Sequence, residues 1–284
     1  MPRHIDEPAQ AVWFADNKAN WNARVPIHAG PDGYGIEAFV ADPGLLTDVV
    51  DFDRRYLGDV HGLSLLHLQC HLGTDTLSWA KLGANVTGLD FSDAALAVAR
   101  SMAVDLGINA RFVESDVYAA AAALGETFDI VYTGVGAINW LPDIARWAQV
   151  VHACTKPGGT FYIREGHPVI WALAWERADD LLVIDLPYFE TDEPGTWVET
   201  ETYLGSGTVA HPTHHDWNHG LGEIITALIG VGFTIDLFEE HRFLEWKATS
   251  GMVERDGRWY MPEHQRDMVP LMYSIRATKP AADQ

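Results

Sequence analysis

Short apolar runs, rich in β-branched and aromatic residues, alternate with longer amphipathic runs between residues 63 and 166. The apolar runs have the length of strands, and the runs between them repeat apolar residues at helical spacing. Strands that alternate with helices are typical of a parallel sheet that is covered on both faces. The predicted strands are residues 63–68, 85–90, 110–115, 128–134 and 160–166, and the predicted helices are residues 74–82, 93–106, 117–124 and 142–154.

The alternating pattern stops on both sides of this region. Residues 8–58 predict helices on either side of the glycine- and proline-rich turn HAGPDGYG. Residues 167–217 contain tryptophan, proline and many acids but no regular alternation, and a helix near 219–231 follows them. Two further strands are predicted at 234–239 and 272–277. We therefore expect one α/β domain with an inserted segment after the fifth strand, rather than two domains.

Acidic residues outnumber basic ones by 40 to 19, which gives a formal net charge of -21. This charge argues against a nucleic acid or an anionic membrane as partner, because both are bound through clustered Lys and Arg. The chain has no apolar span of membrane length, and its first residues, MPRHIDEPAQ, lack the features of a secretion signal, so we expect a cytoplasmic protein. Cys70 and Cys154 fall in predicted core elements, so we expect no disulfide.

The turn after the first predicted strand is the first candidate for a ligand site. In a nucleotide-binding fold this turn is rich in glycine, but here Gly73 is preceded by Gln69, Cys70 and His71. Asp90 ends the second strand, where an acid can hydrogen-bond both ribose hydroxyls of an adenosine cofactor.

Two later segments extend this pattern. Ser115, Asp116 and Val117 follow the third strand, where a polar side chain and a backbone amide would lie beside an adenine. The turn KPGGTFYI leads into the fifth strand, and its glycines, Gly158 and Gly159, are most simply turn residues with positive φ.

In this order and spacing, the motifs resemble those of the class I S-adenosylmethionine-dependent methyltransferases. The first motif of that family reads acid-hydrophobe-Gly-x-Gly-x-Gly, and His67, Gln69, His71 and Gly73 stand at its key positions. The sequence also looks like a bacterial subgroup whose loop reads H-L-Q-C-H-x-G. The resemblance implies a Rossmann-like, seven-stranded, mostly parallel sheet with helices on both faces. We also expect an N-terminal helical lid (residues 1–60), because Trp21, Arg24, His28 and Tyr34 offer polar and aromatic tips on a glycine-rich hinge, and a methyltransferase domain (61–284) with an inserted cap at about 168–217.

The resemblance also implies S-adenosylmethionine as cofactor. This molecule has no pyrophosphate, so the loop needs one close approach, at Gly73, and can accept Gln69 and His71 as polar lining. His67 replaces the acid that usually helps to hold the ammonium group of the ligand, so we expect a carbonyl or the N-terminal segment to do so. The expected cofactor-binding residues are His67, Gln69, His71, Gly73, Asp90, Phe91, Ser115, Asp116, Val117, Thr133 and Gly134.

Methyl transfer from a sulfonium requires alignment, exclusion of water and, for an oxygen or nitrogen acceptor, removal of a proton. The fourth strand lacks the Asn/Asp-Pro-Pro-aromatic signature of base methylation and the terminal Asp of metal-dependent catechol methyltransferases. We therefore expect a small-molecule acceptor with an O, N or S nucleophile. His167 is the first candidate for the base, followed by His219 and His28. The expected substrate-binding residues are Trp21, Arg24, Tyr34 and Trp140.

Several alternatives remain open from the sequence. In HPTHHDWNHGLGE, His215 and His219 would share a helix face at a spacing that can bind zinc, but helix capping by Asp216 or Asn218 is the simpler interpretation, and we expect no metal. The protein could be a non-catalytic sensor or partner subunit that binds adenosylmethionine. A nicotinamide-dependent oxidoreductase is less favoured, because it would need a glycine at Gln69 or His71. The sequence allows a monomer or a homodimer.

Overall fold

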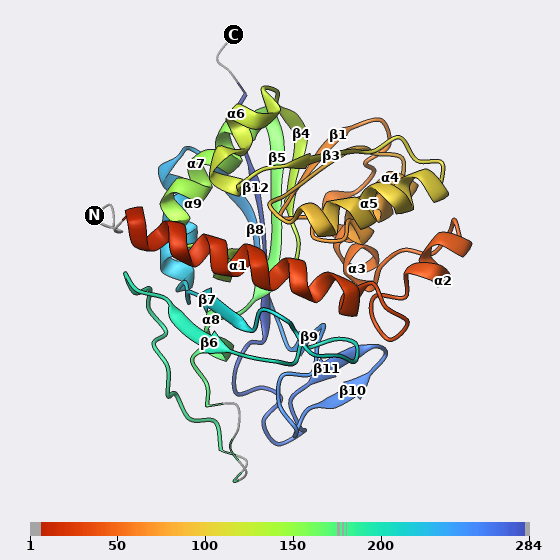
Figure 1. The fold of residues 1–284 in the computed structure, drawn as a ribbon. Helices are drawn as coiled ribbons and strands as arrows, with labels where there is room; N and C mark the ends of the chain where they lie inside the picture. The colour runs from red at the N-terminus through yellow and green to blue at the C-terminus, as the bar shows by residue number, and fades with distance from the viewer. Residues whose placement is uncertain (1–6, 175–176, 178, 180, 282–284) are drawn as a thin grey trace.

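The computed structural model describes residues 7–281 except 175, 176, 178 and 180, so the first part of the expected lid and Trp175 of the expected cap lie outside the described residues. A seven-stranded sheet runs through the centre of the molecule in the order β3-β2-β1-β4-β5-β12-β8 (Figure 1). Strand β12 is antiparallel to both of its neighbours, and the other pairs are parallel. The strands are β1 (Ser64–Leu68), β2 (Asn85–Asp90), β3 (Arg111–Glu114), β4 (Phe128–Thr133), β5 (Thr155–Gly166), β8 (Thr234–His241) and β12 (Met272–Thr278).

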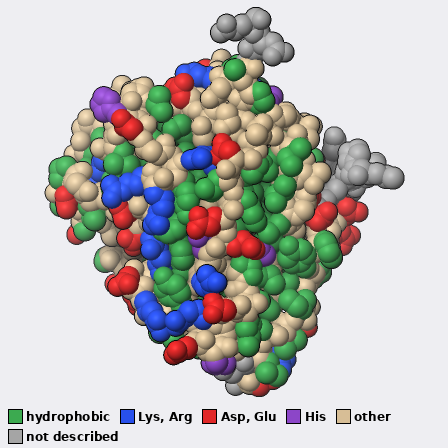
Figure 2. Space-filling model, turned by 180° about the vertical axis from the view of Figure 1, so that it is seen from behind, with side chains coloured by type: hydrophobic (Ala, Val, Ile, Leu, Met, Phe, Trp, Pro, Cys, Tyr) green, Lys and Arg blue, Asp and Glu red, His purple; other side chains and the backbone are tan. Residues whose placement is uncertain are grey.

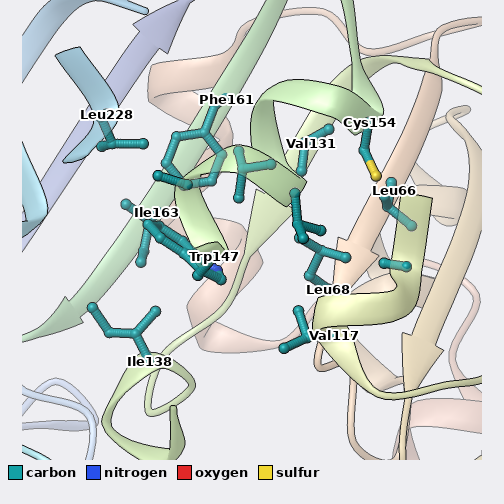
Figure 3. Packing of buried hydrophobic residues seen from close by; sticks show 14 of the residues in the cluster. Leu66, Leu68, Val117, Val131, Ile138, Trp147, Cys154, Phe161, Ile163 and Leu228 are labelled. Atoms are coloured by element: carbon teal, nitrogen blue, oxygen red, sulfur yellow. The ribbon is translucent and has the colours of Figure 1, made fainter. Parts of the chain in front are cut away.

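Helices cover both faces of the sheet, as the alternating pattern predicts. Successive residues of a strand point to opposite faces, so Leu65 packs with α3 and α4 while Leu66 packs with α6 and α7. Figure 3 shows the second of these layers, in which Trp147 and Phe161 are fully buried. The helices of the main domain are α4 (Thr74–Lys81), α5 (Asp93–Asp105), η1 (Val117–Ala119), α6 (Ala120–Leu124), η2 (Ile138–Trp140), α7 (Ile144–Cys154) and α9 (Leu221–Gly230).

The predicted seven-stranded, Rossmann-like sheet is confirmed, and each predicted strand overlaps an observed one. The turn before the fifth strand differs in one detail, because it is part of β5 itself. Gly158 has the expected positive φ, 78°, but Gly159 does not. Instead, a β-carbon on Gly159 would lie 2.9 Å from the carbonyl oxygen of Lys156, so Gly159 is required for space.

The N-terminal region forms α1 (Glu7–His28), α2 (Ile36–Ala41) and α3 (Asp48–Leu57). Helix α1 is 22 residues long and crosses the molecule at the end of the sheet where β1 to β5 finish (Figure 1). It packs against α5 on one side and β7 on the other. Helix α3 begins at Thr47, whose hydroxyl accepts a hydrogen bond from the amide of Val50, and it packs beside α4.

The segment after β5, which we expect to form the cap, contains α8 (Pro168–Trp171) and a hairpin of β6 (Gly195–Val198) and β7 (Thr213–Asp216). A second insertion, which the sequence did not predict, separates β8 from β12. It forms a three-stranded sheet of β9 (Phe243–Leu244), β10 (Val253–Arg255) and β11 (Arg258–Tyr260). The two insertions meet where Trp171 stacks on Trp246, with ring centroids 5.7 Å apart.

Basic and acidic side chains share the surface, and both cysteines are buried. On the face turned away in Figure 1, basic side chains lie among acidic and apolar ones (Figure 2). Cys70 and Cys154 are buried and are not disulfide-bonded. In the described part of the chain, no helix combines the length and the hydropathy that a membrane span requires.

Candidate active site

A cavity opens at the carboxyl ends of β1 to β4, the position at which parallel α/β sheets bind ligands. We call it the strand-end cavity. Its space, about 970 Å³, includes the open solvent at its mouth. Its floor consists of the loops that follow the four strands, and its roof consists of residues from α1, the turn after α1 and the cap. The roof residues are Phe14, Asn17, Trp21, Tyr34 and Tyr203.

All but two of the expected cofactor residues line this cavity, and the exceptions are Gly73 and Thr133. Thr133 is fully buried in β4. A β-carbon on Gly73 would lie 2.8 Å from the Cβ atom of Ala99 and 3.0 Å from the ring of Phe112. Gly73 therefore allows the loop to pack against α5 and β3, and it is not among the residues that line the cavity.

The loop after β1 keeps the backbone conformation of a glycine motif although two glycines are missing. Gln69, His71 and Gly73 have φ values of 56°, 49° and 77°, all in the left-handed region. This conformation is unfavourable for residues with a side chain, by about 1 kcal/mol or more, so the surroundings must stabilise it. The Gln69 side-chain amide donates a hydrogen bond of 2.8 Å to the carbonyl oxygen of Ala137. The ring of His71 packs edge-on against that of Trp21, with centroids 4.9 Å apart.

Two of the expected acids lie at the ends of strands and bind backbone amides. Asp90 accepts hydrogen bonds of 2.8 Å from the amides of both His71 and Ser92. Burial raises its pKa to about 6, and the hydrogen bonds from the backbone lower it in part. Asp116 accepts a hydrogen bond of 2.7 Å from the amide of Tyr118, and burial raises its pKa as well.

His67 occupies the position of the family's first acid but is uncharged. It is 3% exposed, and burial lowers its pKa to about 3. Its Nδ1 atom lies 2.8 Å from the hydroxyl oxygen of Thr76, and its ring packs against that of Tyr132. A neutral imidazole cannot balance the charge of an ammonium group, so His67 cannot form the ion pair with a ligand ammonium that an acid at this position could form.

Glu165, near the end of β5, shapes the floor of the cavity and was not among the predicted residues. Its carboxylate is buried and accepts hydrogen bonds from the amides of Gly136, Ala137, Ile138 and Gly166. These bonds fix the turn between β4 and η2, which lines the cavity. The pair of charged residues Arg164 and Glu165, directly after the apolar residues Phe161 to Ile163, was the signal in the sequence that could have identified it.

A wide cleft, which we call the cap cleft, lies between the main domain and the two insertions. Trp140 and Tyr203 line both this cleft and the strand-end cavity, so the two spaces meet between these side chains. Arg24 also lines the cap cleft, and its guanidinium lies over the rings of Trp21 and Trp140 at 5.2 and 5.8 Å. The four expected substrate residues, Trp21, Arg24, Tyr34 and Trp140, therefore surround this junction.

The three histidines expected to act as base are engaged in internal contacts. His167 caps α8 through its Nδ1 atom, and its Nε2 atom lies 3.1 Å from Glu240, away from the residues that line either space. His219 has Glu223 at 2.8 Å from Nδ1 and the carbonyl oxygen of Leu141 at 2.7 Å from Nε2.

His28 is fully buried behind the roof of the cavity. Its Nδ1 and Nε2 atoms lie 3.4 Å from His71 and 2.8 Å from Thr202. Burial, and then the charge of Arg24, lower its pKa to about 4. His28 therefore connects α1 to the loop after β1 and to the segment after β5.

The histidine-rich segment does not form the expected helix face. His215 lies in β7 and His219 lies in the loop before α9, so the two do not share a helix. His215 instead contacts Thr196 and Asp16, at 2.9 and 3.0 Å. The expected capping by Asp216 or Asn218 is wrong as well, because Gly220 is the N-cap of α9. Within the described residues, no three His, Cys, Asp or Glu side chains are arranged to hold a metal ion.

Comparison with known proteins shows that part of the chain is similar to methyltransferases. Residues 65–159 match the family model described as a methyltransferase domain. The chain is 34% identical over 116 residues to a ubiquinone biosynthesis O-methyltransferase of Erwinia tasmaniensis, covering 40% of this chain and 46% of the relative. It is 31% identical over 146 residues to the enzyme of the same name from Azotobacter vinelandii, covering 48% and 62%. The chain thus spans about half the length of these curated relatives.

Solved structures agree on the fold. A structure described as a putative S-adenosylmethionine-dependent methyltransferase from Listeria monocytogenes superimposes with a TM-score of 0.58 at 19% identity, over 81% of this chain and 96% of the other. A glycopeptide N-methyltransferase in complex with S-adenosylhomocysteine superimposes with a TM-score of 0.52 at 21% identity, over 81% and 88%. Residues 65–159 are therefore similar to a methyltransferase domain, and the chain has the fold of the solved structures described as S-adenosylmethionine-dependent methyltransferases.

Proposed function

We propose that the protein transfers the methyl group of S-adenosylmethionine to a small-molecule acceptor bound in the cap cleft. The observation that carries this proposal is the junction between the two spaces at Trp140 and Tyr203. A cofactor in the strand-end cavity and an acceptor in the cap cleft would meet there, under a roof that limits access of water. Such alignment and exclusion of water are the main requirements of an in-line displacement.

The residues of the strand-end cavity fit this cofactor. Asp90 is buried and Asp116 is half-buried, and neither forms an ion pair among the described residues, so both can accept hydrogen bonds from hydroxyl and amino groups. The Oε1 atom of Gln69 is buried and has no hydrogen-bond partner among the described residues, so it can accept one from a ligand. When bound, the cofactor would supply an electrophilic methyl group on a sulfonium.

An acceptor hydroxyl or amine would need to lose a proton, and His214 is the histidine best placed to take it. It is 5% exposed, lines the cap cleft and packs against Trp140 with centroids 5.4 Å apart. Burial, and then Arg24, lower its pKa to about 4, so it is neutral at pH 7 but a weak base, and Glu199, 3.8 Å from its Nε2 atom, can stabilise the protonated ring. Its Nδ1 atom has no hydrogen-bond partner among the described residues. We assign the proton acceptor to His214 rather than to His167.

The relatives and the charge support a small acceptor. The curated relatives are O-methyltransferases by name, and one structural neighbour methylates a glycopeptide nitrogen, so an oxygen or nitrogen acceptor is in keeping with both. The net charge of -21 disfavours nucleic acid. A non-catalytic sensor would share the cofactor cavity but would never release the methyl group.

Titration calorimetry tests which cofactor the protein binds. We expect S-adenosylhomocysteine to bind in the micromolar range, roughly -8 kcal/mol, and NAD not to bind. Binding of NAD without S-adenosylhomocysteine would contradict the proposal. Incubation of methyl-labelled cofactor with a metabolite library then separates enzyme from sensor, because only an enzyme transfers the label to another molecule.

A further inference from the structure

The strand-end cavity has an unusual balance of charge. Three of the described residues that line it are acids, namely Asp75, Asp90 and Asp116, and none is Lys or Arg. The proposed cofactor carries two positive groups, a sulfonium and an α-ammonium, besides one carboxylate. A buried ammonium is stable only where an acceptor, preferably an anion, replaces its hydration.

Asp75 differs from the other two acids in what already binds it. Asp90 and Asp116 hold backbone amides at the ends of β2 and β3. Asp75 lies in the first turn of α4, and its carboxylate has a hydrogen bond with the side chain of Thr47. Among the described residues, no Lys, Arg or His lies within ion-pair distance of it. Asp75 therefore has an anionic group facing the cavity with most of its capacity to accept hydrogen bonds unused.

Asp75 also lies beside the position from which the family's first acid is missing. A β-carbon on Gly134, at the end of β4, would lie 3.1 Å from the Nε2 atom of His67 and 3.6 Å from the Oδ2 atom of Asp75. The two side chains thus meet at one point against the backbone of Gly134. His67 is neutral there, since burial lowers its pKa to about 3, so Asp75 is the charge that remains at this point.

The roof of the cavity closes over the same point. The hydroxyl groups of Tyr34 and Tyr203 lie 2.5 Å apart, one from the turn after α1 and one from the cap. The charge of Asp75 helps to raise the pKa of both tyrosines, so its field reaches the roof. A cation between Asp75 and this pair of hydroxyls would be enclosed by acceptors from both sides.

From this arrangement we infer that Asp75 binds the α-ammonium of the methionine moiety, in place of an acid at position 67. The inference rests on the proposed function and assigns the ammonium to a side chain of α4, rather than to a carbonyl or to the N-terminal segment. It makes Asp75 responsible for selecting ligands that carry the amino-acid part of the cofactor.

Calorimetry with two ligands tests the inference. S-adenosylhomocysteine carries the ammonium, whereas 5′-methylthioadenosine has the same adenosine thioether and lacks the amino-acid part. For Asp75→Asn, which keeps the shape and the contact with Thr47, we expect affinity for S-adenosylhomocysteine to fall about 10- to 100-fold. We expect affinity for 5′-methylthioadenosine to stay within about twofold, which also shows that the variant is folded. Asp93→Asn is the matched control, because this acid is exposed at the start of α5, and both affinities should stay unchanged.

The other outcomes separate the inference from the proposed function. If Asp75→Asn bound S-adenosylhomocysteine as tightly as the wild type, or lost both ligands equally, the role of Asp75 would be wrong while the proposed function stood. If the wild-type protein bound neither ligand, the proposed function would be wrong and the inference would fall with it.

Discussion

Asp53 is buried and Asp75 is half-buried beside the central sheet, and their carboxylates have different neighbours. Asp53, in α3, receives a hydrogen bond of 2.6 Å from the Nε atom of Arg164. It also receives hydrogen bonds from the hydroxyls of Tyr132 and Tyr162, at 2.7 and 2.9 Å. Asp75, in α4, has a hydrogen bond from Thr47 and no ion pair among the described residues. One carboxylate is therefore saturated by the protein, and the other is not.

This difference indicates which acids stabilise the fold and which are available to bind a ligand. The Asp53 network ties α3 to β4 and β5, and it is complete without any other molecule. Asp75 and Asp90 face a cavity, and burial raises the pKa of each to about 6, so keeping them ionised at neutral pH is unfavourable in the free protein. A ligand with a cation or with hydroxyl groups would remove this penalty. We therefore expect substitutions in the first region to change stability and substitutions in the second to change binding.

The largest effect is expected for Asp53→Ala. Removing this acid leaves the guanidinium of Arg164, which is fully buried, with Glu245 as its one anionic partner among the described residues. We expect the free energy of unfolding to fall by about 3–5 kcal/mol, measured by urea denaturation. Asp267→Ala is the control, since its ion pair with Arg242 is 2.7 Å long but highly exposed, and its removal should cost less than about 1 kcal/mol. Equal losses of unfolding free energy in the two variants would mean that the Asp53 network stabilises the fold no more than an exposed ion pair does.

The next effect is expected for Asp90→Ala, and it concerns binding. The variant loses an acceptor for the ribose hydroxyls, so we expect the affinity for S-adenosylhomocysteine to weaken by about 1.5–3 kcal/mol in calorimetry. Stability should fall less than in Asp53→Ala, because no buried cation loses its partner. Unchanged affinity together with a large loss of stability would mean that Asp90 stabilises the fold and does not bind the ligand.

The sequence predicted the sheet well because strand length and apolar alternation are local signals. It also predicted most of the cavity, since residues that directly follow parallel strands must gather at one edge of the sheet. The left-handed backbone of Gln69 and His71 was not predicted, because it is stabilised by contacts with Ala137 and Trp21 that are distant in sequence. The loop therefore kept the shape of the family motif without keeping its glycines.

Other parts of the molecule gave no usable local signal. Strands β9 to β11 are two or three residues long, too short for a periodic pattern, so the second insertion was missed. His215 was expected on a helix, but pairing of β7 with β6 determines its conformation. Asp75 was missed because an acid in the first turn of a helix is ordinary, where it interacts favourably with the helix dipole. Only the neighbouring His67 and Gly134 give it a role.

The smallest effect is expected in the pH dependence of stability, and it sharpens the comparison at Asp75. Burial raises the pKa of Asp75 from 3.8 to about 6, the hydrogen bond from Thr47 lowers it, and the nearby charges act in both directions. Those charges are Asp53 and Glu245, which raise the pKa, and Arg164, which lowers it.

Because the folded-state pKa is above the unfolded value, the contribution of Asp75 to stability is fully present below about pH 3.8 and is lost as pH rises through about 6. Asp75→Asn removes this loss, so its free energy of unfolding relative to wild type should increase between pH 4 and pH 7 by about 1–3 kcal/mol. Chemical denaturation at several pH values, without ligand, measures this difference, and groups common to both proteins cancel. Asp93→Asn should show no such increase, because its carboxylate is 58% exposed. If the difference in free energy of unfolding between Asp75→Asn and wild type did not change with pH, Asp75 would have a cation partner in the free protein and would resemble Asp53.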